Sequence, residues 1–134
     1  MDVAVSLGLF LAALALAWQG LALAAARESM HPARLAAQRR SEALLSEFLS
    51  TGELRQLRSR GYLEVPSPRR PGRIYRVPAH HGPVAIYQNG RCVQLLCIGP
   101  VNPLPDGDVV LAHKLMIEHC EEEYVRAANP ILNE

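Results

Sequence analysis

Arginine side chains are the residues of this 134-residue chain whose type and spacing best suit a chemical task. Six of them lie between positions 58 and 76, at Arg58, Arg60, Arg69, Arg70, Arg73 and Arg76. A guanidinium is a planar fork that can donate two hydrogen bonds to one phosphate or carboxylate group. This segment therefore predicts a surface that binds either phosphate or a protein partner.

Histidine and cysteine side chains form the second group with possible chemistry. The weak candidates for metal ligands are His80, His81, His113 and Cys120. Cys92 and Cys97 lie five positions apart on a predicted strand, whose alternation sends them to opposite faces, and no Cys-x-x-Cys pair is present. We predict no metal and no cofactor, with His113 as a partly buried histidine and with Cys97 and Cys120 as small apolar core residues.

A cysteine nucleophile is the remaining catalytic option, with Cys92 activated by His80 or His81. The sequence offers no third residue to orient such a pair, no glycine-rich phosphate loop and no paired carboxylates in an apolar setting. We therefore predict that the protein is not an enzyme.

An acidic cluster lies late in the last predicted helix and consists of Glu118, Glu121, Glu122 and Glu123. Negative charge is unfavourable there, because the C-terminal end of a helix is itself negative. The simplest interpretation is a solvated face. The alternative is that these acids pair with the arginines between residues 69 and 76.

An apolar run opens the chain, with no charged residue from Val3 to Ala26. A helix of that length reaches about 36 Å, which is enough to cross a hydrocarbon core of about 30 Å. Arg27 and further arginines follow the run, which predicts a single-pass anchor over residues 1–26 with its N-terminus outside and the following domain in the cytoplasm. The alternatives are a secretory signal cleaved near Ala26, with export of the domain, or an amphipathic or buried helix.

Residues 27–60 predict two juxtamembrane helices. The first covers residues 33–49 and has an apolar face that holds Leu44, Leu45, Phe48 and Leu49. Ser50 and Glu53 have capping-box spacing, which predicts a second helix from Thr51 to Ser59 that Gly61 ends.

Residues 61–134 predict a small α+β domain. Three strands over residues 73–77, 84–88 and 91–98 form an antiparallel meander, because these segments are rich in β-branched and aromatic residues. Asn89-Gly90 predicts a type I′ turn, in which Tyr87 opposes Cys92 and Ile86 opposes Val93. That register places Val84, Ile86, Val93, Leu95 and Cys97 on the core face.

A final helix is predicted to begin at Pro105 and to end at Asn129-Pro130. Its apolar stripe, which we expect to cover the sheet, consists of Val109, Ala112, Met116, Cys120, Tyr124 and Ala127. The predicted fold class is therefore α+β, with an N-terminal transmembrane helix, a helical hairpin, a three-stranded antiparallel meander and a C-terminal covering helix.

The segment from Arg73 to Asn129 resembles the closing part of small uncharacterised bacterial proteins, above all in the sequence LPDGDVVLAHKLMIEHCEEEYVRAAN of residues 104–129. Those proteins join an Arg- and Gly-containing β meander to a helix that begins Leu-Pro and carries His-Lys and an acidic cluster before Tyr and Ala-Asn. The resemblance implies a bacterial origin and supports the element boundaries. It brings no activity with it.

Two functions fit these observations. The first is a membrane-tethered interaction or accessory domain, a non-catalytic subunit of a larger assembly whose partners are membrane lipid and other membrane-protein subunits. The second is a phosphate-binding module that uses the arginine-rich surface on anionic lipid or nucleic acid. A net charge of +1 and an aromatic content of 5% weigh against nucleic acid, which favours basic surfaces with stacking aromatics.

Overall fold

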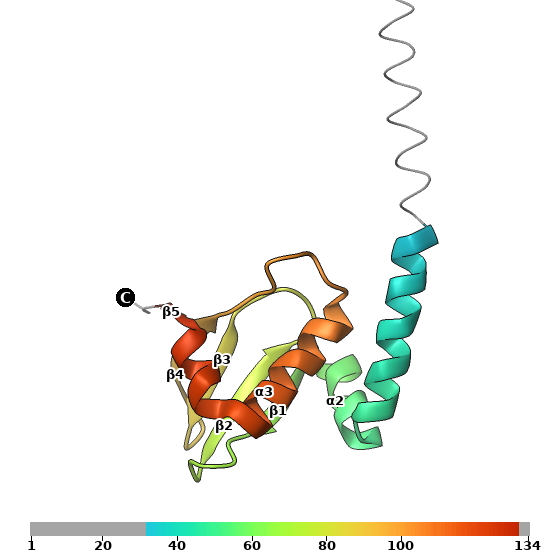
Figure 1. Cartoon of the computed structure of the whole chain (residues 1–134). Coiled ribbons are helices and arrows are strands. Elements are labelled where there is room, and N and C mark those ends of the chain that lie inside the picture. The colour runs from blue at the N-terminus through green and yellow to red at the C-terminus, as the bar shows by residue number, and fades with distance from the viewer. Residues whose placement is uncertain (1–31, 132–134) are drawn as a thin grey trace, which may run out of the picture. The chain divides into compact units, whose positions relative to one another are not determined.

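The computed structural model describes residues 32–131 of the chain. The chain forms two units, residues 1–37 and residues 38–134. Of the first unit only residues 32–37 are described, as the start of a helix that covers residues 32–48. Within the described residues, the strands and the two later helices all belong to the second unit (Figure 1).

The predicted transmembrane anchor over residues 1–26 lies outside the described residues. Between residues 32 and 131, no helix is both long enough and apolar enough to cross a membrane. The predicted fold class is corrected accordingly, because the structure gives the transmembrane helix no support.

A five-stranded antiparallel sheet forms the centre of the second unit. The strands lie side by side in chain order: β1 (Tyr62–Pro66), β2 (Arg73–Pro78), β3 (Val84–Gln88), β4 (Arg91–Cys97) and β5 (Asn129–Ile131). The predicted meander of three strands is therefore wrong in number. Residues 62–66 pair with residues 74–78 of β2, and residues 129–131, after the last helix, return to pair with β4.

The Asn89–Gly90 turn joins β3 to β4 as the sequence predicts. Both residues have positive φ, 50° and 81°, which a type I′ turn requires. The pairing of Tyr87 with Cys92 next to the turn is confirmed.

Beyond the turn, a β-bulge shifts the pairing by one residue, between Ile86 and Tyr87. Ile86 consequently pairs with Gln94 rather than with the predicted Val93. Leu96 lies in the core with 1% of its surface exposed, whereas Val93 and Cys97 are exposed. The predicted core face of this strand is therefore wrong, because an extra residue exchanges the two faces of a strand.

Helix α2 (Thr51–Arg60) has the capping box that its sequence predicts. The Ser50 hydroxyl accepts a hydrogen bond from the Glu53 amide, and the Glu53 carboxylate accepts one of 2.8 Å from the Ser50 amide. At the other end Gly61 adopts a left-handed conformation with φ of 76°. Both predicted boundaries are thereby confirmed to within one residue.

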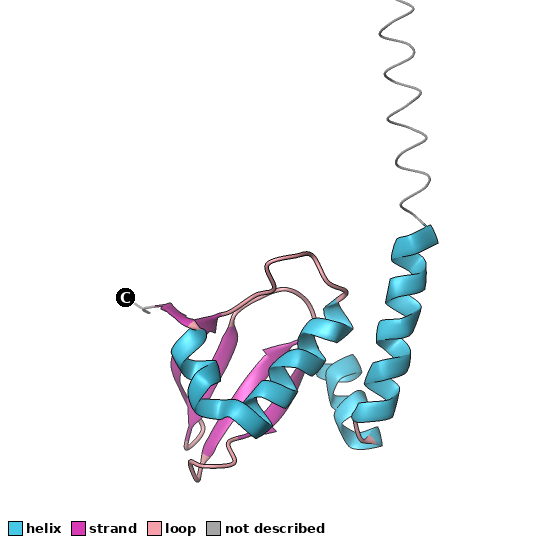
Figure 2. Ribbon diagram, in the orientation of Figure 1, coloured by secondary structure: helices cyan, strands magenta, loops and turns pink. Residues whose placement is uncertain are grey.

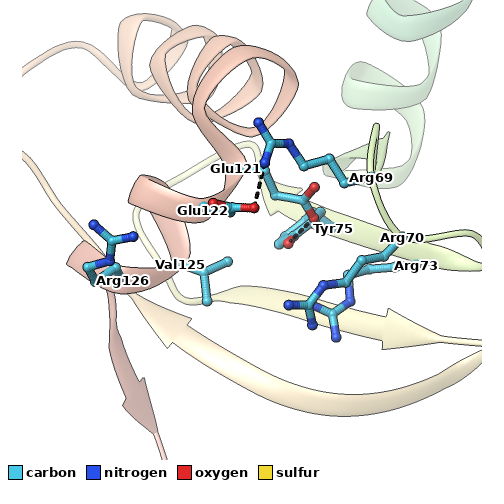
Figure 3. A pocket seen from close by; sticks show the side chains of 8 residues that line it. All are labelled: Arg69, Arg70, Arg73, Tyr75, Glu121, Glu122, Val125 and Arg126. Atoms are coloured by element: carbon cyan, nitrogen blue, oxygen red, sulfur yellow. Dashed lines mark hydrogen bonds and ion pairs between the residues drawn. The ribbon is translucent and has the colours of Figure 1, made fainter.

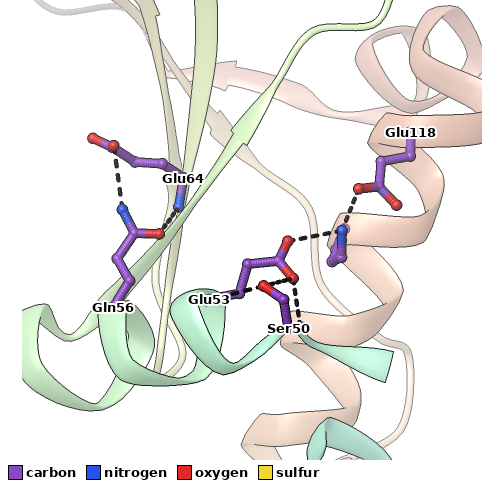
Figure 4. A network of polar contacts seen from close by, with 6 residues as sticks. Ser50, Glu53, Gln56, Glu64 and Glu118 are labelled. Carbon is purple, nitrogen blue, oxygen red and sulfur yellow. Dashed lines mark hydrogen bonds and ion pairs between the residues drawn. The ribbon is translucent and has the colours of Figure 1, made fainter. Parts of the chain in front are cut away.

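The side chain of Gln56 on α2 covers the free edge of β1, as Figure 4 shows. The Glu64 amide donates to Gln56 Oε1 over 3.1 Å, and Gln56 Nε2 donates to the Glu64 carboxylate over 3.2 Å. An edge strand left open would offer such amides to another chain, and here a side chain occupies one of them.

Helix α3 (Asp106–Ala127) lies across one face of the sheet and packs against β1 and β2 (Figure 2). It begins after Pro105 with Asp106 and Asp108 in its first turn, as predicted. Acidic residues stabilise that end of a helix because its free amides are partly positive.

The stripe of α3 that faces the core is not the predicted one. The buried side chains include Val110, Ile117 and Tyr124, together with the charged Lys114 and Glu121. Of the predicted stripe only Tyr124 is among these fully buried side chains, while Met116 and Cys120 lie on the more exposed side. Because the buried stripe contains two charged residues, apolar periodicity does not predict it.

The helix over residues 32–48 packs against the start of α3 from residue 38 onward. Ser41, Leu45 and Leu49 are buried, and a side chain at Gly107 would lie 2.4 Å from the Ser41 hydroxyl. Leu44 and Phe48, which were predicted on the same apolar face, are 39% and 51% exposed. Only half of that predicted face is therefore confirmed.

Lys114 is the one lysine of the chain, and it lies buried between α2 and α3. Its ammonium contacts Glu53 over 3.0 Å and also pairs with Glu118. Burial alone would lower the pKa of Lys114 and raise that of Glu53. Hydrogen bonds and opposite charge outweigh burial in both groups, so the pKa of Lys114 is raised and that of Glu53 is lowered.

The substitution Gly90→Val is expected to lower the free energy of unfolding by about 1–2 kcal/mol, because a β-branched residue resists positive φ. Urea unfolding of the full-length chain measures the loss. Gly99→Val is the control, since Gly99 also has open space around its Cα but no positive φ. Equal effects of the two substitutions would contradict the turn assignment.

The substitution Lys114→Met is expected to destabilise the fold by about 1–3 kcal/mol at pH 7, because it leaves two partly buried carboxylates without their cation. Glu53 has a lowered pKa, so its contribution is present above its ordinary pKa and is lost as pH falls through the folded pKa. The deficit of the variant should therefore shrink in unfolding curves recorded near pH 3. Arg126→Met, at an exposed base of the same helix, is the control; a deficit that does not depend on pH would argue against the ion pairs.

Candidate anion-binding site

A pocket of about 530 Å³ lies between the β1–β2 connection and the C-terminal part of α3 (Figure 3). Four arginines line it: Arg69 and Arg70 from the connection, Arg73 from the start of β2, and Arg126 from α3. The remaining lining comes from Tyr75, Glu121, Glu122 and Val125. We call this group of residues the arginine pocket.

Ser67 folds the connection that carries two of these arginines. Its hydroxyl accepts the backbone amides of Arg69 and Arg70, over 3.3 and 2.8 Å. The same hydroxyl donates to Glu121 Oε1 on α3 over 2.6 Å. Serine favours such turns because its short side chain reaches the next backbone amides, so one residue both shapes the loop and attaches it to the helix.

The β3–β4 hairpin holds the connection from its other side. Gly72 has φ of +75°, and a Cβ there would lie 2.3 Å from the Asn89 side-chain oxygen. The Asn89 amide donates to the Gly72 carbonyl over 2.9 Å, and Gln88 Nε2 donates to the Pro71 carbonyl over 3.1 Å. Gln88 Oε1 in turn accepts from Arg73 Nε over 3.2 Å. These contacts fix the backbone of the connection and the guanidinium of Arg73 without a ligand.

Glu121 forms the floor of the pocket and is 5% exposed. Its Oε1 accepts from the Tyr75 hydroxyl over 2.7 Å as well as from Ser67. Burial alone would raise the pKa of Glu121, but these hydrogen bonds and the charge of Arg73 hold it below its ordinary value. Burial and the bond to Glu121 raise the pKa of Tyr75 to about 12.

The backbone of α3 leaves helical geometry at Cys120, where φ is −136° and ψ is 42°. This break lies directly before Glu121 and divides α3 into two helical stretches. The second stretch carries Glu121, Glu122 and Arg126, so the helix residues of the arginine pocket lie on one short and separately oriented segment.

The arginine pocket is positive overall, since it has four guanidinium groups and two carboxylates. One arginine is neutralised locally, because Arg69 Nη1 pairs with Glu122 Oε1. Arg70 and Arg126 form no side-chain hydrogen bond or ion pair with any residue in the described part of the chain. Two guanidinium groups are therefore available to an anion.

The structure separates the other predicted arginines from this group. Arg76 bonds to Glu64 over 2.8 Å and its guanidinium lies 4.1 Å from the centre of the Tyr87 ring, next to Tyr62. Arg58 lies 3.7 Å from Glu42, and both are exposed. Arg60 lies at the end of α2. Half of the predicted set thus meets in one pocket.

The predicted metal candidates do not converge. His80 and His81 both direct Nδ1 at the Asp106 carboxylate, over 2.8 and 2.7 Å, and the His80 bond followed by the His81 bond lowers the pKa of Asp106. His113 is buried with its Nδ1 2.8 Å from the Tyr124 hydroxyl, and burial lowers its pKa. Among residues 32–131, no three His, Cys, Asp or Glu side chains form a group that could hold a metal ion.

Two of the three cysteines differ from their predicted roles, because Cys97 and Cys120 are exposed rather than core residues. Cys92 is exposed, with Sγ 3.9 Å from the Gln94 carbonyl. The prediction of a core position is wrong for Cys97 because of the bulge in β4. It is wrong for Cys120 because the buried stripe of α3 is displaced from the predicted one.

Arg126, Tyr75 and Glu121 are the site residues that the sequence did not identify as such. The acidic cluster pointed towards them, since the alternative that its acids pair with arginines near position 70 is realised by Glu122 and Arg69. Only the fold places these residues together, because more than fifty positions separate the arginine loop from the acids.

The substitution Tyr75→Phe is expected to lower the free energy of unfolding at pH 7 by about 1.5–3 kcal/mol, because it removes a donor to a buried carboxylate. The deficit should decrease at low pH, since Glu121 has a lowered pKa and its contribution is lost as pH falls through the folded value. Thermal unfolding across pH 3–7 tests this. Tyr87→Phe, which removes a hydroxyl without a hydrogen bond in the described residues, should have little effect; a matching loss there would contradict the assignment.

Comparisons of the chain with protein-family models, with curated proteins and with solved structures find no match. Residue roles therefore follow from the geometry of the arginine pocket and its surroundings.

Proposed function

We propose that residues 38–131 form a non-catalytic binding module that recognises a phosphate-bearing ligand through the arginine pocket. The observation that carries this proposal is that four arginines line one pocket and that only one of them, Arg69, forms an ion pair within residues 32–131. Phosphate suits such a site because its oxygens accept from a guanidinium in pairs.

The rigidity of the loop supports the same function. Ser67, Gly72 and Gln88 fix the backbone and one guanidinium by hydrogen bonds that need no ligand. A site that is already ordered loses less conformational freedom on binding, so more of the interaction energy appears as affinity.

A second candidate function is that of an accessory subunit in a larger assembly. An apolar groove of about 230 Å³, lined among others by Ile98, Leu104 and Met116, favours it. Val101 lies in the adjoining connection and is fully exposed. Association through this groove would resist added salt, whereas binding at the arginine pocket would weaken with it. Attachment to a membrane and a cytoplasmic position stay predictions.

The proposal predicts that Arg70→Gln combined with Arg126→Gln weakens the binding of inorganic phosphate to the full-length chain at least about tenfold, since each charged hydrogen bond contributes about 1.5–3 kcal/mol. Isothermal titration calorimetry at two salt concentrations measures this. The control is the pair Arg55→Gln and Arg91→Gln, which changes the net charge equally at exposed positions outside the pocket. Equal losses in both pairs would show that only overall charge matters and would overturn the proposal.

A further inference from the structure

The apolar groove has one polar side chain, that of His113, among the described residues that line it. The groove has a volume of about 230 Å³ and lies between the connection after β4 and the first half of α3. In a pocket of this kind, a single polar group sets the orientation and the specificity of the ligand. The lining includes Ile98, Leu104, Val109, Ala112, His113 and Met116.

The core fixes the orientation of the His113 ring. His113 is only 7% exposed, and its Nδ1 lies 2.8 Å from the hydroxyl of Tyr124, which is fully buried. The two rings are perpendicular, with 5.7 Å between their centres. The Tyr124 ring is held in turn by an edge contact with Tyr75. The histidine therefore presents one edge to the core and cannot rotate freely in the groove.

The hydrogen bond to Tyr124 also determines which ring nitrogen carries the proton. Burial raises the pKa of Tyr124, so its hydroxyl keeps its proton, and it has no partner other than Nδ1 among residues 32–131. If Nδ1 donated, that hydroxyl proton would be buried without an acceptor, which costs free energy. Tyr124 therefore donates and Nδ1 accepts. A neutral imidazole whose Nδ1 accepts carries its proton on Nε2.

The Nε2 of His113 remains accessible and without a partner. It forms no hydrogen bond within residues 32–131, and it is not one of the fully buried polar atoms that lack a partner. Because Nδ1 faces the core, the accessible edge of the ring is the one that carries Nε2, on the side of the groove. Burial lowers the pKa of His113, so the ring is neutral at pH 7. The groove thus offers one uncharged N–H donor.

Three properties of a ligand follow from this lining. It must supply a hydrogen-bond acceptor, since Nε2 only donates. It must be uncharged, because no charged side chain lines the groove and a buried ion without a counter-charge is costly. An apolar cavity of about 150 Å³ holds one benzene, so a groove of about 230 Å³ has room for roughly nine non-hydrogen atoms.

We infer that the apolar groove binds a small, uncharged, apolar carbonyl compound whose oxygen accepts a hydrogen bond from His113 Nε2. Leu104 and Met116 are 43% and 37% exposed, and the ligand would remove part of this apolar surface from water. Water alone fits the site poorly, because an ordered water needs two to four polar partners. The inference goes beyond the proposed function, since no residue that lines the arginine pocket lines the groove.

The binding of three probes with equal numbers of non-hydrogen atoms tests the inference: acetophenone, indole and benzoate. Acetophenone has an uncharged carbonyl, the N–H of indole only donates, and benzoate accepts but is charged. NMR titration of the full-length chain at pH 7 follows the methyl signals of Ala112 and Met116. We expect acetophenone to bind at least about fivefold more tightly than either of the others, as one net hydrogen bond provides. This comparison needs no variant.

The location of the ligand is tested by Ala112→Leu, which adds a larger side chain at an exposed position of the groove. It should weaken the binding of acetophenone at least about fivefold, since the added carbons occupy the space of the ligand. Ala127→Leu is the matched control, because Ala127 is also exposed on α3 but does not line the groove. Equal effects of the two substitutions would place the ligand elsewhere and overturn the inference.

The proton on Nε2 is observed directly in the nitrogen–proton correlations of the His113 ring. We expect protonated Nε2 in the free protein and a shift of its resonance when acetophenone binds. Tyr124→Phe removes the donor to Nδ1, so the ring can adopt either tautomer and the preference for acetophenone over indole should shrink. Tyr124 acts here as a positioning residue, because it does not line the groove. Protonated Nδ1 in the wild-type chain would contradict the inference.

The remaining outcomes also decide against the inference. If acetophenone and indole bind equally, the groove is merely apolar and His113 selects nothing. If benzoate binds most tightly, the ligand is an anion rather than an uncharged compound. If no probe binds, the groove takes no ligand of this class, and the accessory-subunit function is its remaining use. None of these results bears on phosphate binding at the arginine pocket, so the proposed function is tested separately.

Discussion

The hydrogen bonds of one buried carboxylate connect the three parts of this domain. Glu121 belongs to α3, and its carboxylate accepts two hydrogen bonds. One comes from the Ser67 hydroxyl in the β1–β2 connection and the other from the Tyr75 hydroxyl in the sheet. Ionised carboxylates are seldom buried, because leaving water is costly unless donors replace the lost hydration. The loop, the sheet and the helix must therefore keep their relative positions for Glu121 to stay in place. The same requirement sets the arginines of the loop around it.

Local signals predicted the parts of the fold that depend on few residues. The Asn89–Gly90 turn, the capping box of Ser50 and Glu53, and the left-handed Gly61 each follow from the conformational preferences of one or two residues, and all three are confirmed. The fifth strand was not predictable in this way, since Asn129–Ile131 is short and contains a proline, and only its pairing with β4 makes it a strand. The bulge in β4 was equally hidden, because nothing in the local sequence distinguishes the regular register from the shifted one.

Charge in the core explains the largest error. The buried stripe of α3 contains Lys114 and Glu121, whose burial depends on partners far away in the sequence, so apolar periodicity selected a neighbouring stripe with Met116 and Cys120. The site, too, was only partly predictable from the sequence. Arginines that are close in sequence could be proposed as one surface, and three of the six do meet. The carboxylate that gives the pocket its chemical character was recognised only as one of a group of acids. Its role depends on the tertiary hydrogen bonds from Ser67 and Tyr75, which the sequence does not predict.

The single lysine has a practical consequence for work on this protein. Amine-reactive labels and lysine-directed crosslinkers require an accessible, uncharged ε-amino group, and Lys114 is 8% exposed, holds two carboxylates and has a raised pKa. In the native state such reagents will therefore leave the Lys114 side chain unreacted. Acylation of Lys114 then requires α2 and α3 to separate, so the rate of that one reaction, followed by mass spectrometry, reports the opening of the domain at a single position without any engineered probe.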